Sequence, residues 1–178
     1  QEVLTLSPRA FVATFVMARV YQRGEGNLAR ALYYLLRAKR ALLSSFGRAP
    51  KREAAKRWHK RILRHEMWLM GTMDRREDQI AVLDEHDALY RPPWLSRRIW
   101  PLMKLKRYDE ARKVGYKLTK SDDPWLRMSG YNGLLAIAGE RYERGGSYRI
   151  GKQGIEATQG HFCVIAANLI DGALEVFA

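Results

Sequence analysis

The chain has 178 residues, but it contains a single cysteine, Cys163, and only six prolines. With one cysteine it cannot form an internal disulfide, and a zinc site built on several thiolates is excluded. Cys163 lies in the apolar run 162–167, where we expect it to be a small buried hydrophobic residue. The scarcity of proline, together with abundant Ala, Leu, Arg, Lys and Glu, favours helices over strands.

Long hydrophobic runs are also missing. The longest apolar stretches, around 11–18 and 162–167, are too short to span a bilayer. No export signal is visible, although the chain starts at Gln1 rather than Met. We therefore expect a cytoplasmic protein, with removal of a signal from a trimmed N-terminus as the alternative.

Recognisable catalytic and metal-binding patterns are absent as well. His59 and His65 are six positions apart, which places them on different faces of one helix. The acidic run 84–87 consists of consecutive residues, whose side chains point in different directions on a helix. Neither a phosphate-binding glycine loop nor a nucleophile elbow is found. The sequence predicts a protein that is not an enzyme and that needs neither metal nor cofactor.

Acidic residues are in short supply. The chain has 32 basic and 19 acidic residues, a formal net charge of +13. Between Arg37 and Arg64 a single acid, Glu53, opposes a dense run of basic residues. If 51–70 is a helix, one half of its circumference is cationic and the other half is apolar. The predicted basic face consists of Arg52, Lys56, Arg57, Lys60, Arg61 and Arg64.

Helical periodicity and turn residues divide the chain into nine expected helices. They cover 8–22, 28–42, 51–70, 77–89, 94–105, 108–119, 125–138, 140–158 and 161–170. Ser7-Pro8 is a typical helix start, and Gly24 to Asn27 is a typical break. Pro101 is expected to kink the fifth helix. The eighth helix contains four glycines and is expected to be irregular.

One short pattern repeats along the chain. Residues 107–111, RYDEA, recur as RYERG at 141–145, which is 34 positions later. Residues 26–32, GNLARAL, have the same form, and Asp122-Asp123-Pro124 forms a turn between units. These segments resemble the tetratricopeptide repeat family, in which a large residue opens the second helix and a small residue follows three positions on.

The resemblance implies an all-α, right-handed α-solenoid of antiparallel helix pairs, about four pairs and a partial fifth. We expect one repeat domain over 1–178, cut from a longer chain, with units at 8–46, 51–91, 92–124, 125–159 and 160–178. A looser helical-repeat family is the alternative, because 51–89 matches the pattern poorly. In addition, Gly115 and Gly151 stand where the family has large apolar side chains.

Such a stack has a concave groove lined by the first helix of each pair, and grooves of this family bind peptides or helices of partner proteins. The resemblance therefore implies a scaffold or adaptor that binds a protein partner, with the basic face as a second, electrostatic site for an acidic partner. The predicted groove residues are Arg97, Trp100, Arg127, Tyr131, Leu134, His161 and Asn168. The alternatives are a nucleic-acid-binding module that uses the basic face, an anionic membrane surface, and a fragment of an enzyme or sensor.

Overall fold

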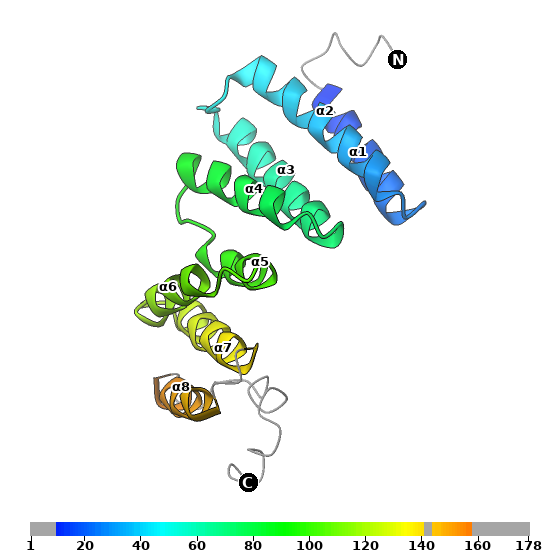
Figure 1. The fold of residues 1–178 in the computed structure, drawn as a ribbon. Coiled ribbons are helices and arrows are strands. Elements are labelled where there is room, and N and C mark those ends of the chain that lie inside the picture. The colour runs from blue at the N-terminus through cyan, green and yellow to red at the C-terminus, as the bar shows by residue number, and fades with distance from the viewer. Residues whose placement is uncertain (1–9, 141–143, 158–178) are drawn as a thin grey trace. The chain divides into compact units, whose positions relative to one another are not determined.

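The computed structural model describes residues 10–140 and 144–157. All regular structure in these ranges is helical (Figure 1), which confirms the expected all-α class. The chain divides into two compact units, unit 1 over 1–93 and unit 2 over 94–178. The expected single repeat domain stays a prediction, and each unit is described by itself.

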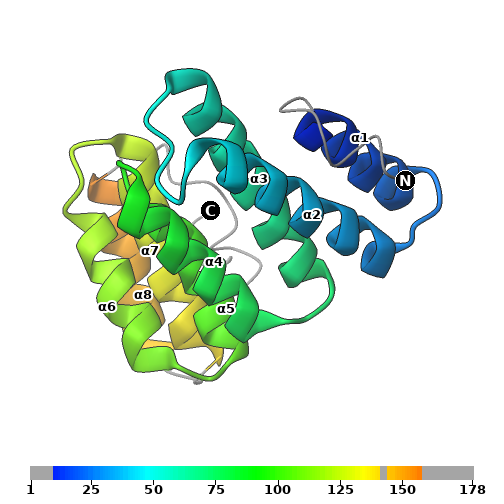
Figure 2. The same ribbon diagram turned by 90° about the horizontal axis from the view of Figure 1, so that it is seen from above.

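Unit 1 contains two helical hairpins. The first is formed by α1, Ala10–Arg23, and α2, Leu28–Phe46, and the second by α3, Glu53–Thr72, and α4, Arg76–Leu89. Figures 1 and 2 both show α1 beside α2, and α3 beside α4. These bounds agree with the helices expected from the sequence to within a few residues, because each helix has a clear apolar stripe and a polar break at its end.

Unit 2 begins with the 3-10 helix η2, Leu95–Arg98, followed by α5, Ile99–Lys104. The helices α6, Tyr108–Thr119, α7, Pro124–Glu140, and α8, Arg144–Ala157, complete it. The expectation of one kinked α-helix over 94–105 is corrected, because a 3-10 helix over 95–98 changes directly to α-helix at Ile99. Because α5 begins there, Pro101 lies in its first turn, where a missing N–H breaks no helical hydrogen bond. The expected ninth helix, 161–170, lies outside the described residues.

The two helices of each hairpin are joined by turns with a shared backbone feature. One residue in each turn has left-handed backbone angles, with φ of 64° at Gly26, 57° at Asp74 and 59° at Lys106. Each of these residues lies two positions before the next helix begins. The pairs α1–α2, α3–α4 and α5–α6 therefore turn back in a similar way, although only the first turn has the glycine that sequence rules predict.

The last two of these turns are closed by equivalent hydrogen bonds. The N–H of Arg75 donates to the carbonyl of Met70 at 2.8 Å, and the N–H of Arg107 donates to the carbonyl of Leu102 at 2.9 Å. Both span five residues, as in a Schellman turn at the end of a helix. A repeated hairpin geometry is thus present even where the sequence pattern of the second pair is weak.

Small residues allow the paired helices to approach closely. Ala31 in α2 and Ala111 in α6, both three positions into their helices, are completely buried. In α4 the same position holds the larger residue Gln79. Here the small residue is Gly71, on the opposite helix. A Cβ atom added at Gly71 would lie 2.8 Å from Gln79 Nε2. The space for the larger side chain is thus provided by glycine on α3.

The hydrophobic core of unit 1 joins its first three helices. It is formed by Phe11, Phe15, Ala18, Ala31, Leu32, Leu35, Ala38, Leu42, Ile62, Leu69 and Met70. In unit 2, α6 and α7 cross where Gly115 and Gly130 face each other. Among the helices of the described residues, none combines the length and the apolarity that a membrane-spanning helix requires.

Candidate binding surface

Aromatic side chains connect α1 with α3. The ring of Phe15 lies edge-on to Trp58 with centroids 5.7 Å apart, and its centroid is also 5.7 Å from that of His65. The guanidinium of Arg61 lies 5.2 Å from the ring centroid of Phe15 and 5.1 Å from that of Trp58. One face of α3 is therefore directed toward α1, with an arginine at the junction.

Three arginines gather at this junction. Arg19 and Arg23 lie one turn apart on α1, and Arg61 is on α3. Burial, and then the positive charges of Arg23 and Arg61, lower the pKa of Arg19. Within the part of the chain that the structure describes, no acidic residue forms an ion pair with any of the three. The junction is therefore a concentration of uncompensated positive charge.

His65 lies next to these arginines and is only 8% exposed. Its ring is stacked on Trp68, with centroids 6.2 Å apart and an interplanar angle of 11°. Burial, followed by the charges of Arg19, Arg23 and Arg61, lowers its pKa to about 4. The imidazole is therefore neutral at neutral pH. Its buried Nε2 atom has no hydrogen-bond partner among the described residues.

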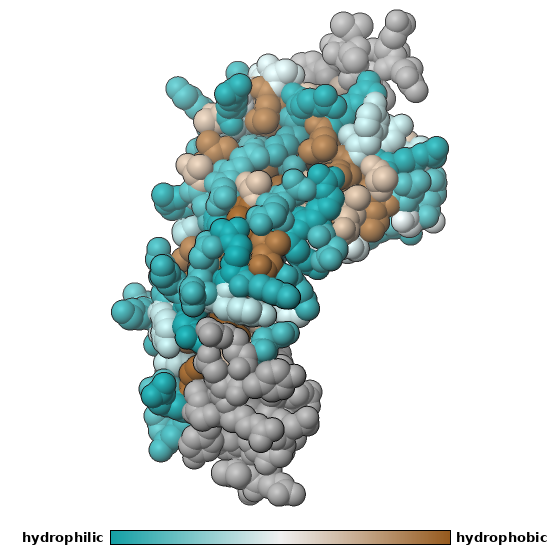
Figure 3. Space-filling model, in the orientation of Figure 1, coloured by the Kyte–Doolittle hydropathy of each residue, from teal (hydrophilic) through white to brown (hydrophobic). Residues whose placement is uncertain are grey.

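Exposed apolar side chains adjoin the arginines. Val16 and Val20 are 52% and 48% exposed, and their spacing on α1 places them on the same side as Arg19 and Arg23. Trp68 is 45% exposed and follows Arg61 two turns along α3. We call these six residues the α1–α3 surface: Val16, Arg19, Val20, Arg23, Arg61 and Trp68. Apolar patches between hydrophilic ones are a general feature of the face of unit 1 in Figure 3.

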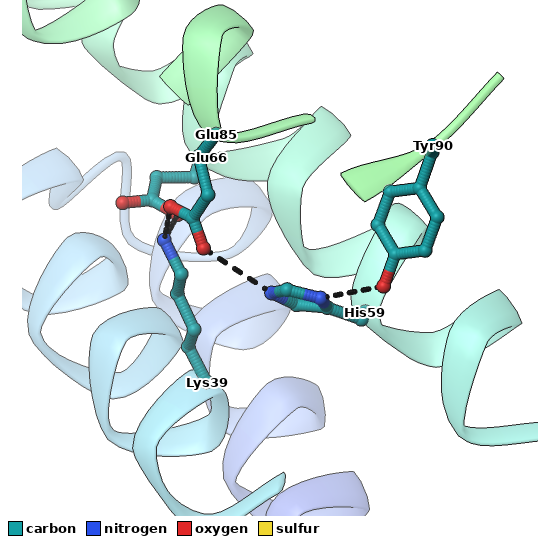
Figure 4. A network of polar contacts seen from close by, with 5 residues as sticks. All are labelled: Lys39, His59, Glu66, Glu85 and Tyr90. Atoms are coloured by element: carbon teal, nitrogen blue, oxygen red, sulfur yellow. Dashed lines mark hydrogen bonds and ion pairs between the residues drawn. The ribbon is translucent and has the colours of Figure 1, made fainter. Parts of the chain in front are cut away.

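A second cluster of ionisable residues lies where α2, α3 and α4 meet (Figure 4). Lys39 Nζ is 2.9 Å from Glu66 Oε2 and 2.5 Å from Glu85 Oε2. His59 Nδ1 is 2.7 Å from the hydroxyl of Tyr90. His59 Nε2 and Glu85 Oε1 are 3.4 Å apart, within ion-pair range but without a well-formed hydrogen bond. The five side chains form one connected network that is largely buried, with Glu85 one-third exposed.

The pKa values of the network follow from burial and from these contacts. Burial would lower the pKa of Lys39, but the charge of Glu66 and the hydrogen bonds to Glu66 and Glu85 outweigh it and raise this pKa. Burial raises the pKa of Glu66, with Lys39 acting in the opposite direction. Burial would also raise the pKa of Glu85, yet its contacts with His59 and Lys39 hold it below the ordinary value.

The hydroxyl of Tyr90 is held protonated, because burial and then the charge of Glu85 raise its pKa to about 12. Lys39 is likewise held as a cation between two carboxylates, so its amine is not available as a nucleophile. The network fits a polar cross-link between three helices. It also shows that the acidic run 84–87 directs Glu85 inward, toward Lys39, rather than toward a shared cation.

The six residues of the predicted basic face differ in what surrounds them. Lys56 Nζ bonds Glu53 Oε1 at 2.7 Å, and Lys60 Nζ lies 4.9 Å from the ring centroid of Tyr90. Arg61 joins the arginines of α1. The remaining three, Arg52, Arg57 and Arg64, are exposed. One pair within α3, two tertiary contacts and exposure to solvent thus give the residues of one sequence stripe four different surroundings.

The predicted groove residues that the structure describes in unit 2 lie on η2, α5 and α7. Trp100 is exposed, with Lys104 Nζ 4.5 Å from its ring centroid, and Arg97 is exposed beside Trp94. Arg127 and Tyr131 are half-buried on α7. His161 and Asn168 lie outside the described residues.

The prediction of Leu134 as a groove residue is corrected. This side chain is 3% exposed, and a Cβ atom added at Gly115 would lie 2.8 Å from Leu134 Cδ2. Leu134 therefore fills the space that Gly115 leaves between α6 and α7. The apolar pattern of α7 runs around much of its circumference, so position in the sequence did not show which of its apolar side chains face inward.

Sequence reasoning missed Arg19, Arg23 and Trp68. The spacing of the two arginines in the sequence already places them on one helical face. Their relation to Arg61 depends on the packing of α1 against α3, which no local pattern shows. No cluster of His, Cys, Asp and Glu suited to a metal ion occurs in 10–140 or 144–157.

Comparison of the chain with protein-family models, with curated proteins and with solved structures gave no match. The tetratricopeptide resemblance therefore stays a prediction.

Proposed function

We propose that this chain is a helical-repeat scaffold that binds a segment of a partner protein. The observation that carries the proposal is the α1–α3 surface, where Val16, Val20 and Trp68 expose apolar area beside three arginines. Exposed apolar and aromatic groups next to arginine are typical of protein-binding surfaces. This surface belongs to the first helices of two successive hairpins, the position that the repeat resemblance implies for partner binding.

The proposal extends to unit 2, where Trp100 and Tyr131 are the candidate contacts of the corresponding first helices. Trp100 is exposed and Tyr131 is half-buried, and aromatic side chains are a residue type favoured at binding sites. Nucleic-acid binding through the basic face is the alternative function, supported by the net charge of +13. It ranks second because Lys56 is engaged with Glu53 and Lys60 with the Tyr90 ring.

Site-specific photo-crosslinking in the source cell tests the proposal. A photoreactive amino acid at Val16 or Trp68 is expected to capture a discrete protein. The same group at Ser45, which is exposed on α2, serves as the matched control. Nuclease treatment of the lysate shows whether a product depends on nucleic acid. No product specific to the two surface positions, or products that nuclease removes, would contradict protein binding at this surface.

A further inference from the structure

The charge of the α1–α3 surface indicates the chemistry of its partner. Arg19, Arg23 and Arg61 repel one another, and among the described residues no acid compensates them. We infer that this surface binds an acidic segment of a partner protein, with two or more carboxylates placed on the three arginines. The inference rests on the proposed scaffold function and specifies its ligand.

Carboxylates fit this site because guanidinium groups bind them through two parallel hydrogen bonds. Arg61 is held in place by its packing on Phe15 and Trp58, so little side-chain freedom is lost when it binds. Arg19 and Arg23 lie one turn apart on α1, a spacing that matches acidic residues one turn apart on a partner helix. His65 is neutral beside them, and its buried Nε2, which has no hydrogen-bond partner in the described part of the chain, lies in the same region.

The apolar part of the surface indicates that the acidic segment also has an apolar side. Val16 and Val20 are about half exposed, and Trp68 offers one ring face because the other is stacked on His65. A partner segment that covers these residues removes their apolar area from water. The ligand is therefore an amphipathic segment, with Asp or Glu beside aliphatic or aromatic residues.

A nucleic acid fits this surface less well. Proteins that bind single strands stack bases on open aromatic rings. Here Arg61 covers the rings of Phe15 and Trp58, and the valines offer aliphatic area without a stacking face, so Trp68 is the single aromatic residue among the six of this surface with an open ring face. Three arginines around one junction also make a compact site rather than a track along a phosphate backbone.

The test is a selection of random peptides displayed on phage, with the full chain as bait. Three baits are compared: the native chain, the triple variant Arg19→Gln, Arg23→Gln, Arg61→Gln, and a charge-matched control, Arg40→Gln, Arg48→Gln, Lys51→Gln. The control residues are exposed in unit 1 and lie outside the α1–α3 surface. The native chain and the control are expected to enrich amphipathic peptides. In these peptides acidic residues lie one helical turn apart, beside apolar residues of the same helix. The triple variant is expected to lose them.

The best native-selected peptide is then synthesised, and its affinity is measured by fluorescence anisotropy. We expect the triple variant to bind it at least about tenfold more weakly than the native chain, and the control to stay within about threefold. Because Arg61 packs on two rings, the double variant Arg19→Gln, Arg23→Gln is measured as well. Circular dichroism verifies that each variant is folded.

The outcomes separate the two proposals. Peptides without acidic enrichment, or acidic peptides that bind the triple variant equally well, would overturn the acidic-segment inference and leave peptide binding intact. No peptide above the background of the empty support would overturn both proposals. Displacement of the selected peptide by a single-stranded oligonucleotide, but not by a free acidic peptide of the same charge, would favour nucleic acid and also overturn the inference.

Discussion

Lys39 of α2 and Glu66 of α3 form an ion pair of 2.9 Å, with the lysine side chain 13% and the glutamate side chain 6% exposed. Glu85 of α4 binds the same ammonium group, so one cation serves carboxylates from two other helices. A buried charge is tolerated only when its partners are present. The lysine is therefore the element that allows both carboxylates to remain near the core of unit 1.

Lys39→Met is expected to destabilise the protein by about 3–5 kcal/mol, because Glu66 and Glu85 are left together without a cation. The double variant Lys39→Met, Glu66→Leu is expected to recover most of that loss, since it removes the cation and the more deeply buried carboxylate together. Urea unfolding followed by far-UV circular dichroism measures both. Equal stability of the single and double variants would show that the carboxylates do not depend on Lys39.

Tyr90→Phe removes only a hydroxyl, but this leaves the buried Nδ1 atom of His59 without its partner at 2.7 Å. We expect a loss of about 1–3 kcal/mol in the free energy of unfolding. Tyr33→Phe is the matched control, because Tyr33 is 53% exposed. A similar effect of the two substitutions in urea unfolding would exclude a special role for the His59–Tyr90 bond.

Acid is expected to destabilise unit 1 through His65. Its pKa is about 4 in the folded chain, below the ordinary value of 6.5. The unfolded chain therefore takes up this proton first, and the stabilisation present above pH 6.5 is lost as the pH falls toward 4. The effect is on the order of 2 kcal/mol once screening by solvent is allowed for.

His65→Phe keeps a ring between Phe15 and Trp68 but cannot be protonated. We expect this variant to lose less stability than the native chain between neutral pH and pH 4.5. Thermal unfolding at several pH values compares the native chain with His65→Phe and with a second variant, His86→Phe. Burial also lowers the pKa of His86, but Asp87 opposes this effect. Parallel pH profiles for the native chain and His65→Phe would contradict the assignment.

The crossing of α6 and α7 is expected to tolerate no side chain at Gly130. A Cβ atom there would lie 2.7 Å from the backbone nitrogen of Thr119 and 2.9 Å from the carbonyl oxygen of Gly115. Because backbone cannot move aside without separating the helices, Gly130→Ala should cost about 1–3 kcal/mol. Gly151→Ala is the control: its Cβ would lie 3.8 Å from Leu135, and replacing a helical glycine should stabilise by about 0.5–1 kcal/mol.

Gly133 provides a second test of the packing in unit 2. Its added Cβ would collide with the Cδ1 atom of Ile99, which is the end of a side chain rather than backbone. We expect Gly133→Ala to be destabilising, and Ile99→Val, which removes Cδ1, to relieve part of that cost in the double variant. Additive effects of the two substitutions in urea unfolding would show that the contact does not limit stability.

Local sequence patterns were sufficient to predict some helices but not others. The helix over 108–119 was predicted to the residue, because Arg107 and Glu110 pair across its first turn at 2.6 Å and the apolar residues follow at helical spacing. The segment 94–105 was predicted less well, because the position of Pro101 allows either a kink or a new start. In the structure α5 begins at Ile99, whose side chain packs against Gly133.

The candidate site was predicted only in part. Arg61 was recognised as part of a cationic stripe, but the stripe was treated as one surface. Packing against α1 and α4 then placed Arg61 beside Phe15 and Lys60 over Tyr90. Arg19 and Arg23 were not predicted as site residues, because two arginines on one helix are common. The third charge, Arg61, lies near them only because α3 packs against α1.

The sequence by itself determined the all-helical class, most helix boundaries and the strongly positive charge. These follow from residue composition, helical periodicity and turn residues, which act over a few positions along the chain. Only the tertiary structure decided that Lys39 meets Glu66 and Glu85, that Leu134 is buried and that Arg61 lies near enough to the arginines of α1 for their charges to interact. Such contacts join residues far apart in sequence, and their free energy depends on burial and neighbouring charge, which exist only after the helices have packed.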